Sequence, residues 1–373
     1  MNPRRLALDL LARIDDDGAY ANIVVPAALA DSGLDSADRA MVTDLVYGVT
    51  RLRRAIDAMT DRFVSASPDP RTRRLLRLGT YQWAWAGIPP HAAVSETVAL
   101  APARTRGFVN AVLRRVVAAP GPEAMAWPSE AVRLSYPDWI HELLVGELGE
   151  ADAAAAMTRM DERPTVARRA DGYAQDRSSQ WVAAAVEAAP GERIVDLCAA
   201  PGGKATAIAT AGADVIAVDL HVHRVGLIRD NATRLDGGSG HLAVLCADGR
   251  RAPLAAGSAD AVLLDAPCSG LGALRRRADA RWRITRGDLD DLVVLQRELL
   301  HEAARLVAPG GRLVYSVCTL TSVESTDHPV PDGFEIDDRV PDGVWRPHRH
   351  GWRTLPHDDD TDGMVLIRYR RRT

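Results

Sequence analysis

The sequence predicts an α/β domain of the Rossmann-like type, a mainly parallel doubly wound sheet, preceded by an all-α helical bundle. From Arg193 onward, short β-branched runs alternate with helical patterns, which is typical of an open parallel sheet. The first of these runs ends in Gly202-Gly203-Lys204, a small-residue turn that opens an alanine-rich helix. Before residue 126, apolar residues recur at helical spacing between proline breakers.

The helical part is expected over residues 1–125, as one bundle of about five to seven helices. Leu6, Leu10, Leu11 and Ile14 recur with helical periodicity, and Pro89-Pro90 is one of the breaks between helices. Residues 126–175 are expected to form a helical linker, a shortened connector bracketed by prolines. The second domain is expected over residues 176–373.

In the second domain, five strands are predicted at Ile194–Cys198, Val215–Asp219, Leu242–Cys246, Ala261–Asp265 and Arg312–Cys318. Leu289–Val307 predicts a long amphipathic helix, closed by the breaker Pro309-Gly310-Gly311. Met364–Tyr369 predicts a further strand in a hairpin. The stretch 326–362, rich in proline, aspartate and histidine, supports no assignment.

Composition narrows the class of protein. The 373 residues are 47% hydrophobic and 26% charged, as in an ordinary globular enzyme, and no apolar run reaches membrane-spanning length. The start of the chain lacks a signal-peptide pattern, and the four cysteines form no paired metal motif. We therefore expect a reduced, cytoplasmic enzyme with no metal and no membrane contact. The sequence does not determine the oligomeric state, for which a monomer is the expectation.

The net charge of −4 gives no global signature of nucleic-acid binding, so any such binding has to come from local patches. Arginine is dense in the helical part, and several clusters in one small domain favour RNA phosphates as partner over merely solvated helix faces. These arginines are Arg51, Arg53, Arg54, Arg71, Arg73, Arg74, Arg77, Arg104, Arg106, Arg114 and Arg115.

The glycine turn does not match a P-loop, because Cys198 and Ala205 stand where that motif needs a glycine and a hydroxyl. Lys204 is the single lysine among 46 basic residues. In a chain that otherwise uses arginine, this indicates a need for a compact ammonium. Asp219 ends the second strand, where a carboxylate can bind ribose hydroxyls, and Asp248 follows the third. Together they indicate an adenosine cofactor.

Two cysteines are expected beside that cofactor. Asp265 ends the fourth strand shortly before Cys268, and Cys318 ends the fifth. A disulfide between them is not expected in the cytoplasm, and too few ligands are present for zinc. These groups suit one reaction. A thiolate that adds to carbon 6 of cytosine makes carbon 5 nucleophilic toward a sulfonium methyl group, and an acid at N3 stabilises the adduct. A base then removes the proton from carbon 5.

The motifs Asp-Leu-Cys-Ala-Ala-Pro-Gly-Gly-Lys, Asp-Ala-Pro-Cys-Ser-Gly-Leu-Gly and Tyr-Ser-Val-Cys-Thr-Leu resemble the signatures of the Sun-type RNA 5-methylcytosine methyltransferases. Arg39–Tyr47 and Gly107–Arg115 resemble the RNA-binding NusB domain. The resemblance implies an S-adenosylmethionine-dependent RNA (cytosine-C5) methyltransferase that acts on small-subunit (16S) rRNA.

The resemblance also implies roles for residues. Cys318 would be the nucleophile, Cys268 would assist product release, and Asp265 would contact the base. The residues that would hold S-adenosylmethionine are Cys198, Ala199, Ala200, Pro201, Gly202, Gly203, Lys204, Asp219, Asp248 and Asp265. The residues by themselves do not rank Cys318 above Cys268.

Past the Cys268 loop, we interpret Arg275, Arg276, Arg277, Arg281 and Arg283 around Trp282 as an RNA backbone clamp.

Three departures from the family pattern stand out. Val317 replaces the usual threonine before the nucleophile, Met364-Val365 replaces an aromatic pair, and the connector over 163–180 is too short for the usual RNA-facing subdomain. Val317 and the missing subdomain motivate one alternative, a non-catalytic RNA-binding or ribosome assembly factor. Another alternative is cytosine methylation of tRNA or DNA by the same site.

Overall fold

The computed structural model describes residues 1–234 and 240–373. The chain forms two compact units, one of Met1–Val145 with Arg276–Arg283, the other of Gly146–Arg275 with Ile284–Thr373. The expected linker 126–175 is therefore divided: residues up to 145 pack with the first unit and the remainder with the second.

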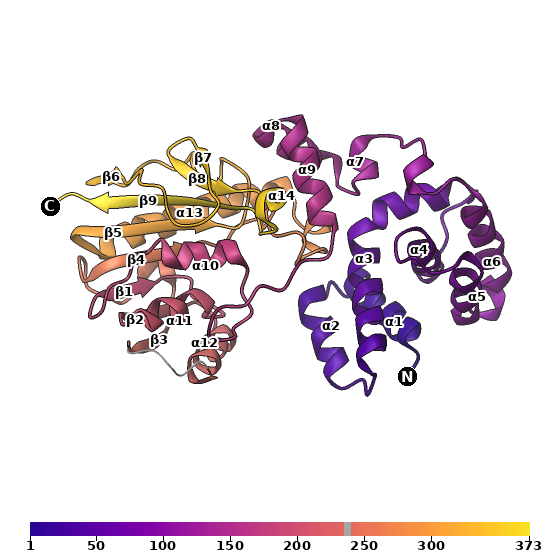
Figure 1. Cartoon of the computed structure of the whole chain (residues 1–373), viewed down its shortest axis with the longest axis horizontal. Helices are drawn as coiled ribbons and strands as arrows, with labels where there is room; N and C mark the ends of the chain where they lie inside the picture. Colours follow the sequence, from indigo (N-terminus) through magenta and orange to yellow (C-terminus); the bar gives the residue numbers. More distant parts are fainter. Residues whose placement is uncertain (235–239) are drawn as a thin grey trace. The chain divides into compact units, whose positions relative to one another are not determined.

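The first unit is a helical bundle, as predicted (Figure 1). Asn2, Asp35 and Asp69 cap three of its helices, because their side chains accept backbone N–H groups of the first turn. Its elements are α1 (Pro3–Asp15), α2 (Ala21–Ala30), α3 (Ser36–Asp61), α4 (Pro70–Ala84), α5 (Pro90–Leu100), α6 (Ala103–Ala118), η1 (Pro122–Ala124), α7 (Glu130–Arg133), η3 (Ala280–Trp282) and the start of α8 (Asp138–Leu148). Apolar residues of α1 to α6 form one core.

The second unit is a mainly parallel sheet with helices on both faces, which confirms the predicted fold class (Figure 1). The strands are β1 (Arg193–Asp196), β2 (Asp214–Asp219), β3 (Leu242–Cys246), β4 (Ala259–Asp265), β5 (Val307–Val317), β6 (Phe334–Ile336), β7 (Arg346–His348), β8 (Gly351–Thr354) and β9 (Met364–Arg371). The helices are α9 (Glu150–Asp161), α10 (Arg177–Ala184), α11 (Gly203–Thr210), α12 (Val222–Arg234), η2 (Gly249–Arg251), α13 (Arg286–Leu306) and α14 (Pro356–Asp359).

The strand order is β3-β2-β1-β4-β5-β9-β8-β7, with β6 also paired to β9. The pairs from β3 to β5 are parallel, and β9 runs antiparallel to β5. One core cluster joins the sheet to α13, and a second joins its other face to α10, α11 and α12. The chain order reverses between β1 and β4, and in such sheets the crevice at the carboxyl ends next to that reversal is where ligands bind.

The breaker Pro309-Gly310-Gly311 does not close a helix, so this prediction is wrong. α13 ends at Leu306, and Val307 already pairs with Ala259 of β4. A register shift then separates this pair from Ala261, which pairs with Arg312. Gly310, with φ of +75°, supplies the left-handed backbone that this irregular part of β5 uses.

The uninterpreted stretch 326–362 contributes β6, β7, β8 and α14, and so widens the sheet on its antiparallel side. The strands are short, and their proline and histidine content hides the alternation that predicts strands. Within residues 1–234 and 240–373, we find no helix with the length and apolar character needed to cross a membrane.

Part of the arginine run after Cys268 is structural, so its interpretation as an RNA clamp is wrong for Arg281 and Trp282. Arg281 is 0% exposed, and its guanidinium carbon lies 4.0 Å from the ring centre of Tyr136. The Trp282 indole N–H donates to the carbonyl of Thr50 (2.7 Å), and the Arg53 guanidinium lies over the indole ring. These contacts anchor Arg281 and Trp282 in the helical unit, where the two side chains are not available to phosphates or bases, whereas Arg277 is exposed.

Candidate functional site

The glycine-rich turn connects β1 to α11 at the carboxyl edge of the sheet. Gly202 has φ of +100°, and a Cβ there would lie 3.2 Å from the Cα of Ile228. Gly203 begins α11, and a Cβ there would lie 2.8 Å from the Tyr173 ring. Both positions therefore require glycine, because the backbone is left-handed at one and crowded at both.

A pocket of about 200 Å³ opens over this turn. Of the predicted cofactor residues, those that line it are Cys198, Ala199, Ala200, Pro201, Gly203, Lys204 and Asp265. The pocket wall also contains residues that the sequence reasoning missed: Tyr173, Ala174, Gln175, Ser179 and Asp196. Gly202, Asp219 and Asp248 are not part of the wall.

Asp196, the last residue of β1, is a buried carboxyl that faces the pocket. It is 1% exposed, and neither carboxylate oxygen accepts a hydrogen bond from the part of the chain that the structure describes. Burial, reinforced by the charge of Asp265, raises the pKa of Asp196 to about 7. A cationic ligand group in the pocket would compensate this charge. Its position at the end of the first strand could have identified it.

Lys204 and Asp265 form an ion pair on the pocket wall. Lys204 Nζ lies 2.6 Å from Asp265 Oδ2, and the Ser316 hydroxyl donates to Asp265 Oδ1 at 2.7 Å. Burial disfavours the ammonium, but the attraction of Asp265 outweighs burial and raises the pKa of Lys204. The single lysine is therefore a charged group in contact with a carboxylate at the end of β4.

The structure brings the two predicted cysteines together. Cys268 Sγ and Cys318 Sγ are 3.3 Å apart, both cysteines are half-buried, and neither forms a disulfide. The hydrogen bond with Cys318 and burial raise the pKa of Cys268, and the charges of Glu324 and Asp265 act in the same direction. Within the described residues, no group of three or more His, Cys, Asp or Glu could hold a metal ion.

The two predicted ribose- and adenine-binding aspartates bond to their own surroundings. Asp219 is 3% exposed, and its carboxylate accepts the backbone N–H groups of Ala200 and His221, both at 3.2 Å. Asp219 thus shapes the glycine-rich turn. Asp248 caps η2 and pairs with Arg250, whose hydrogen bond lowers the pKa of Asp248. A direct contact of either carboxylate with a cofactor remains a prediction.

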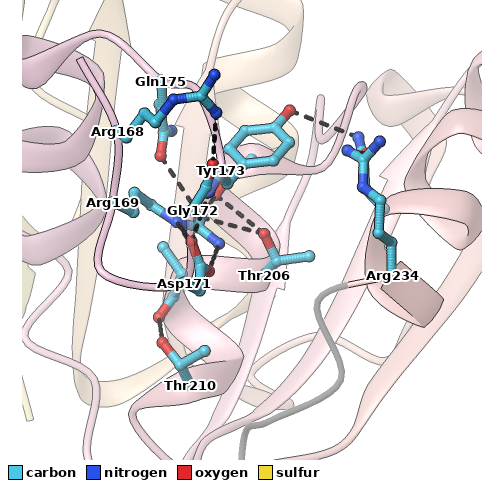
Figure 2. Close-up of polar contacts among 12 residues, drawn as sticks. Arg168, Arg169, Asp171, Gly172, Tyr173, Gln175, Thr206, Thr210 and Arg234 are labelled. Carbon is cyan, nitrogen blue, oxygen red and sulfur yellow. Dashed lines mark hydrogen bonds and ion pairs between the residues drawn. The ribbon is translucent and has the colours of Figure 1, made fainter.

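Residues 168–175, for which the sequence shows no periodicity, form a small hairpin over the turn (Figure 2). Arg169 donates to the carbonyl of Gly203 and to the Thr206 hydroxyl (3.1 Å), and it pairs with Asp171. Tyr173 lies beneath the Arg169 guanidinium, whose carbon is 4.9 Å from the ring centre. The hairpin therefore holds the Tyr173 ring against the glycine-rich turn, as one wall of the pocket.

The arginine clusters of the helical unit separate into two kinds. Arg74 and Arg77 form ion pairs inside the bundle, Arg74 with Asp16 (2.8 Å) and Arg77 with Asp57 (2.7 Å). The arginines of α6, by contrast, are exposed: Arg104, Arg106, Arg114 and Arg115. Two of them, Arg106 and Arg114, line a groove of about 840 Å³ between α5 and α6.

Two family models match the chain. The model of the 16S rRNA methyltransferases RsmB/F matches residues 183–368, and the model of the NusB family matches residues 1–118. A putative methyltransferase of Mycobacterium tuberculosis is 35% identical over 453 residues, covering 99% of this chain and 96% of the relative. Ribosomal RNA small subunit methyltransferase B of Thermus thermophilus is 35% identical over 351 residues, covering 86% and 85% of the two chains.

The alignment with the mycobacterial relative spans 453 residues and is longer than this chain of 373 residues, so the relative has positions that this chain lacks. Among solved structures, that of PH0851 matches with a TM-score of 0.76 and 22% identity, covering 100% of this chain and 99% of that chain. At this identity the match supports the fold alone.

Proposed function

Because the chain belongs to the RsmB/F family of 16S rRNA methyltransferases, we propose that it methylates carbon 5 of a cytosine in 16S rRNA through a covalent bond to Cys318. One observation carries the proposal: two thiols lie 3.3 Å apart at the ends of neighbouring strands. The Lys204–Asp265 pair stands on the wall of the adjacent pocket.

The pocket fits S-adenosylmethionine. The turn Cys198–Lys204 offers close backbone approach, and the buried carboxylate of Asp196 suits a cationic ligand. When bound, this cofactor supplies an electrophilic methyl group on a positively charged sulfur. We assign the cofactor to this turn, with Asp265 on the same wall, and expect Asp219 and Asp248 to assist at the adjacent strand ends.

The charges around the two thiols favour Cys318 as the nucleophile. The charge of a Cys318 thiolate is among the causes that raise the pKa of Lys204, so this sulfur lies within the field of the ammonium. Cys268 instead lies in the field of two carboxylates, Glu324 and Asp265, which favour its protonated form. These charges support the proposal that Cys318, rather than Cys268, attacks the base.

In the proposed reaction, the Cys318 thiolate adds to carbon 6 and the electron pair of the C5=C6 bond becomes available at carbon 5. Asp265, as a carboxylate, can accept a hydrogen bond from the amino group of the base, and the Lys204 ammonium beside it offsets the negative charge that the attack places on the ring. After methylation, a base assisted by Cys268 removes the carbon 5 proton. The C5=C6 bond then forms again and the sulfur–carbon bond breaks, which restores the Cys318 thiolate.

Val317, at the position where the family usually has threonine, does not favour the alternative of a non-catalytic protein. Its side chain is 0% exposed and packs with the core cluster between the sheet and α13. A threonine hydroxyl at this position would lie in the same core.

Methyl transfer from labelled S-adenosylmethionine to unmodified 16S rRNA, tRNA and DNA, measured with the full chain, tests the proposed function. Incorporation into 16S rRNA, recovered as 5-methylcytosine, is the expected result. If the methyl group were incorporated only into tRNA or DNA, that nucleic acid, and not 16S rRNA, would be the substrate. Binding of 16S rRNA without incorporation into any of the three would favour the non-catalytic assembly factor.

We expect Tyr173→Ala to weaken S-adenosylmethionine binding about tenfold, because the ring forms one wall of the pocket at Gly203. Isothermal titration calorimetry measures the dissociation constant. Arg168→Ala is the matched control, since Arg168 bonds the carbonyl of Gly172 in the same hairpin and is not part of the pocket wall. Equal affinity in all three proteins would refute a role of the Tyr173 ring.

For RNA, we propose the groove between α5 and α6 as a phosphate-binding surface, because Arg106 and Arg114 line it and are exposed. Replacing both by Gln should weaken 16S rRNA binding and reduce the slope of log K against log salt by about 1 to 2. Arg13→Gln, an exposed arginine of α1, is the control. An unchanged slope in the double variant would place the RNA elsewhere.

A further inference from the structure

Behind the two cysteines lies a buried carboxylate, Glu324, that the sequence reasoning did not single out. It is 0% exposed. Oε1 accepts the Ser269 backbone N–H (2.7 Å) and Gln296 Nε2 (3.2 Å). Oε2 accepts the hydroxyls of Ser269 (2.6 Å) and Thr321 (2.8 Å). Four neutral donors, two on each oxygen, are the set that an ionised carboxylate needs.

Ser269, the residue after Cys268, also contacts Thr319, the residue after Cys318. Ser269 has one hydroxyl proton, and it is used toward Glu324. In the 3.0 Å contact between the Ser269 and Thr319 hydroxyls, Thr319 is therefore the donor. The backbone N–H of Gly272 also donates to the carbonyl of Cys318 at 3.0 Å. The two cysteine loops are thus joined through the groups that Glu324 orders.

The residue before Cys268 is fixed by the same network. Gln296 Nε2 donates to the carbonyl of Pro267 at 2.9 Å, in addition to Glu324. Gln296 Oε1 lies 3.2 Å from His328 Nε2. Burial lowers the pKa of His328 to about 4, so at neutral pH this ring is uncharged and its Nε2–H donates to Gln296. Cys268 is therefore held on both sides, by Pro267 and by Ser269.

We propose that Glu324 is a positioning residue that fixes the spacing of the two cysteine loops, so that one thiol bonds carbon 6 while the other acts at carbon 5 of the same base. This inference rests on the proposed cysteine mechanism. The carboxylate does not touch the reacting atoms and acts through Ser269 and Gln296. Because a displacement of about 1 Å between reacting groups can cost about 100-fold in rate, a fixed spacing matters for turnover.

Glu324→Gln tests the proposal, since it preserves volume but places an NH₂ group where an oxygen accepts two donors. We expect kcat for 5-methylcytosine formation in 16S rRNA to fall by about 10-fold to 100-fold. KM for RNA and the dissociation constant of S-adenosylmethionine should remain those of the wild type. The ratio of covalent protein–RNA adduct to methylated product, measured by denaturing gel and nucleoside analysis, should rise because the release step loses its alignment.

Two further variants keep the test decisive. Glu302→Gln is the matched control, a buried acid on α13 that pairs with Arg305, and it should behave as the wild type. Ser269→Ala removes one hydroxyl donor to Glu324 but keeps the backbone N–H. It should also raise the ratio of covalent adduct to methylated product. If Glu324→Gln does not fold, Ser269→Ala tests the proposal in its place. A folded Glu324→Gln protein with wild-type kcat and ratio would overturn the inference. An inactive wild type would instead refute the proposed function, which separates the two failures.

Discussion

Cys318→Ala should abolish the formation of 5-methylcytosine in 16S rRNA, with a loss of about 10⁴-fold or more, because no other group can take the place of the attacking thiolate. Cys268→Ala should have a different effect. It keeps the attacking sulfur but removes the thiol 3.3 Å away, so a covalent protein–RNA adduct should accumulate. Denaturing gels separate the adduct from free protein, and nucleoside analysis measures the product.

Cys246→Ala is the matched control for both cysteine variants. Cys246 ends β3, is exposed, and contacts the carbonyl of Leu220 rather than another thiol. The variant should retain wild-type activity and form no persistent adduct. Full activity of Cys318→Ala, or an adduct that persists in Cys318→Ala and not in Cys268→Ala, would contradict the assignment of roles.

Lys204→Met should lower kcat by about 100-fold or more, because it removes the one cation that contacts Asp265 on the pocket wall within the described residues. Asp196 and Asp265 would then face the pocket as two carboxylates without the ammonium, whose attraction lowers the pKa of Asp196 in the wild type. Lys204→Arg should not restore activity, since a planar guanidinium is larger than the ammonium that fits 2.6 Å from Asp265 Oδ2. Steady-state methyl transfer measures both variants.

A cation at the start of β1, the strand that leads into the glycine-rich turn, is the control for Lys204. Arg193 begins β1, is exposed, and bonds the carbonyl of Ser258. Arg193→Met should change the thermal stability slightly and leave kcat unchanged. If Lys204→Met retained wild-type kcat, the ammonium would have no part in the chemistry, and the single lysine would be an ordinary residue of the helix start.

The sequence predicted the parts of the fold that follow from periodicity. β2 and β3 end at the residues expected, Asp219 and Cys246, because β-branched runs there are bounded by turn residues. On the antiparallel side of the sheet, β9 was predicted as Met364–Tyr369, but β6 and β7 could not be predicted, since they have three residues each. Such strands are stabilised by their pairing with β9 and β8 and not by local propensity.

The candidate site was predictable only where a residue type marks it. Cys268, Cys318 and Lys204 are conspicuous in the sequence because such residues are rare in this chain. Glu324 and Asp196 are ordinary acids among 50, and only burial and the arrangement of donors distinguish them. The arginine run shows the opposite error. A charge pattern indicates solvent or phosphate, whereas Arg281 is buried against an aromatic ring.

The most direct measurement identifies the sulfur that bonds the base. The wild-type chain, incubated with S-adenosylmethionine and 16S rRNA containing 5-fluorocytosine, should stop at the covalent stage, because fluorine at carbon 5 cannot leave as a proton. Nuclease and protease digestion followed by mass spectrometry then locates the attached nucleotide. We predict that it lies on the peptide containing Cys318. A nucleotide on Cys268, or no adduct while unmodified 16S rRNA is methylated normally, would contradict the account.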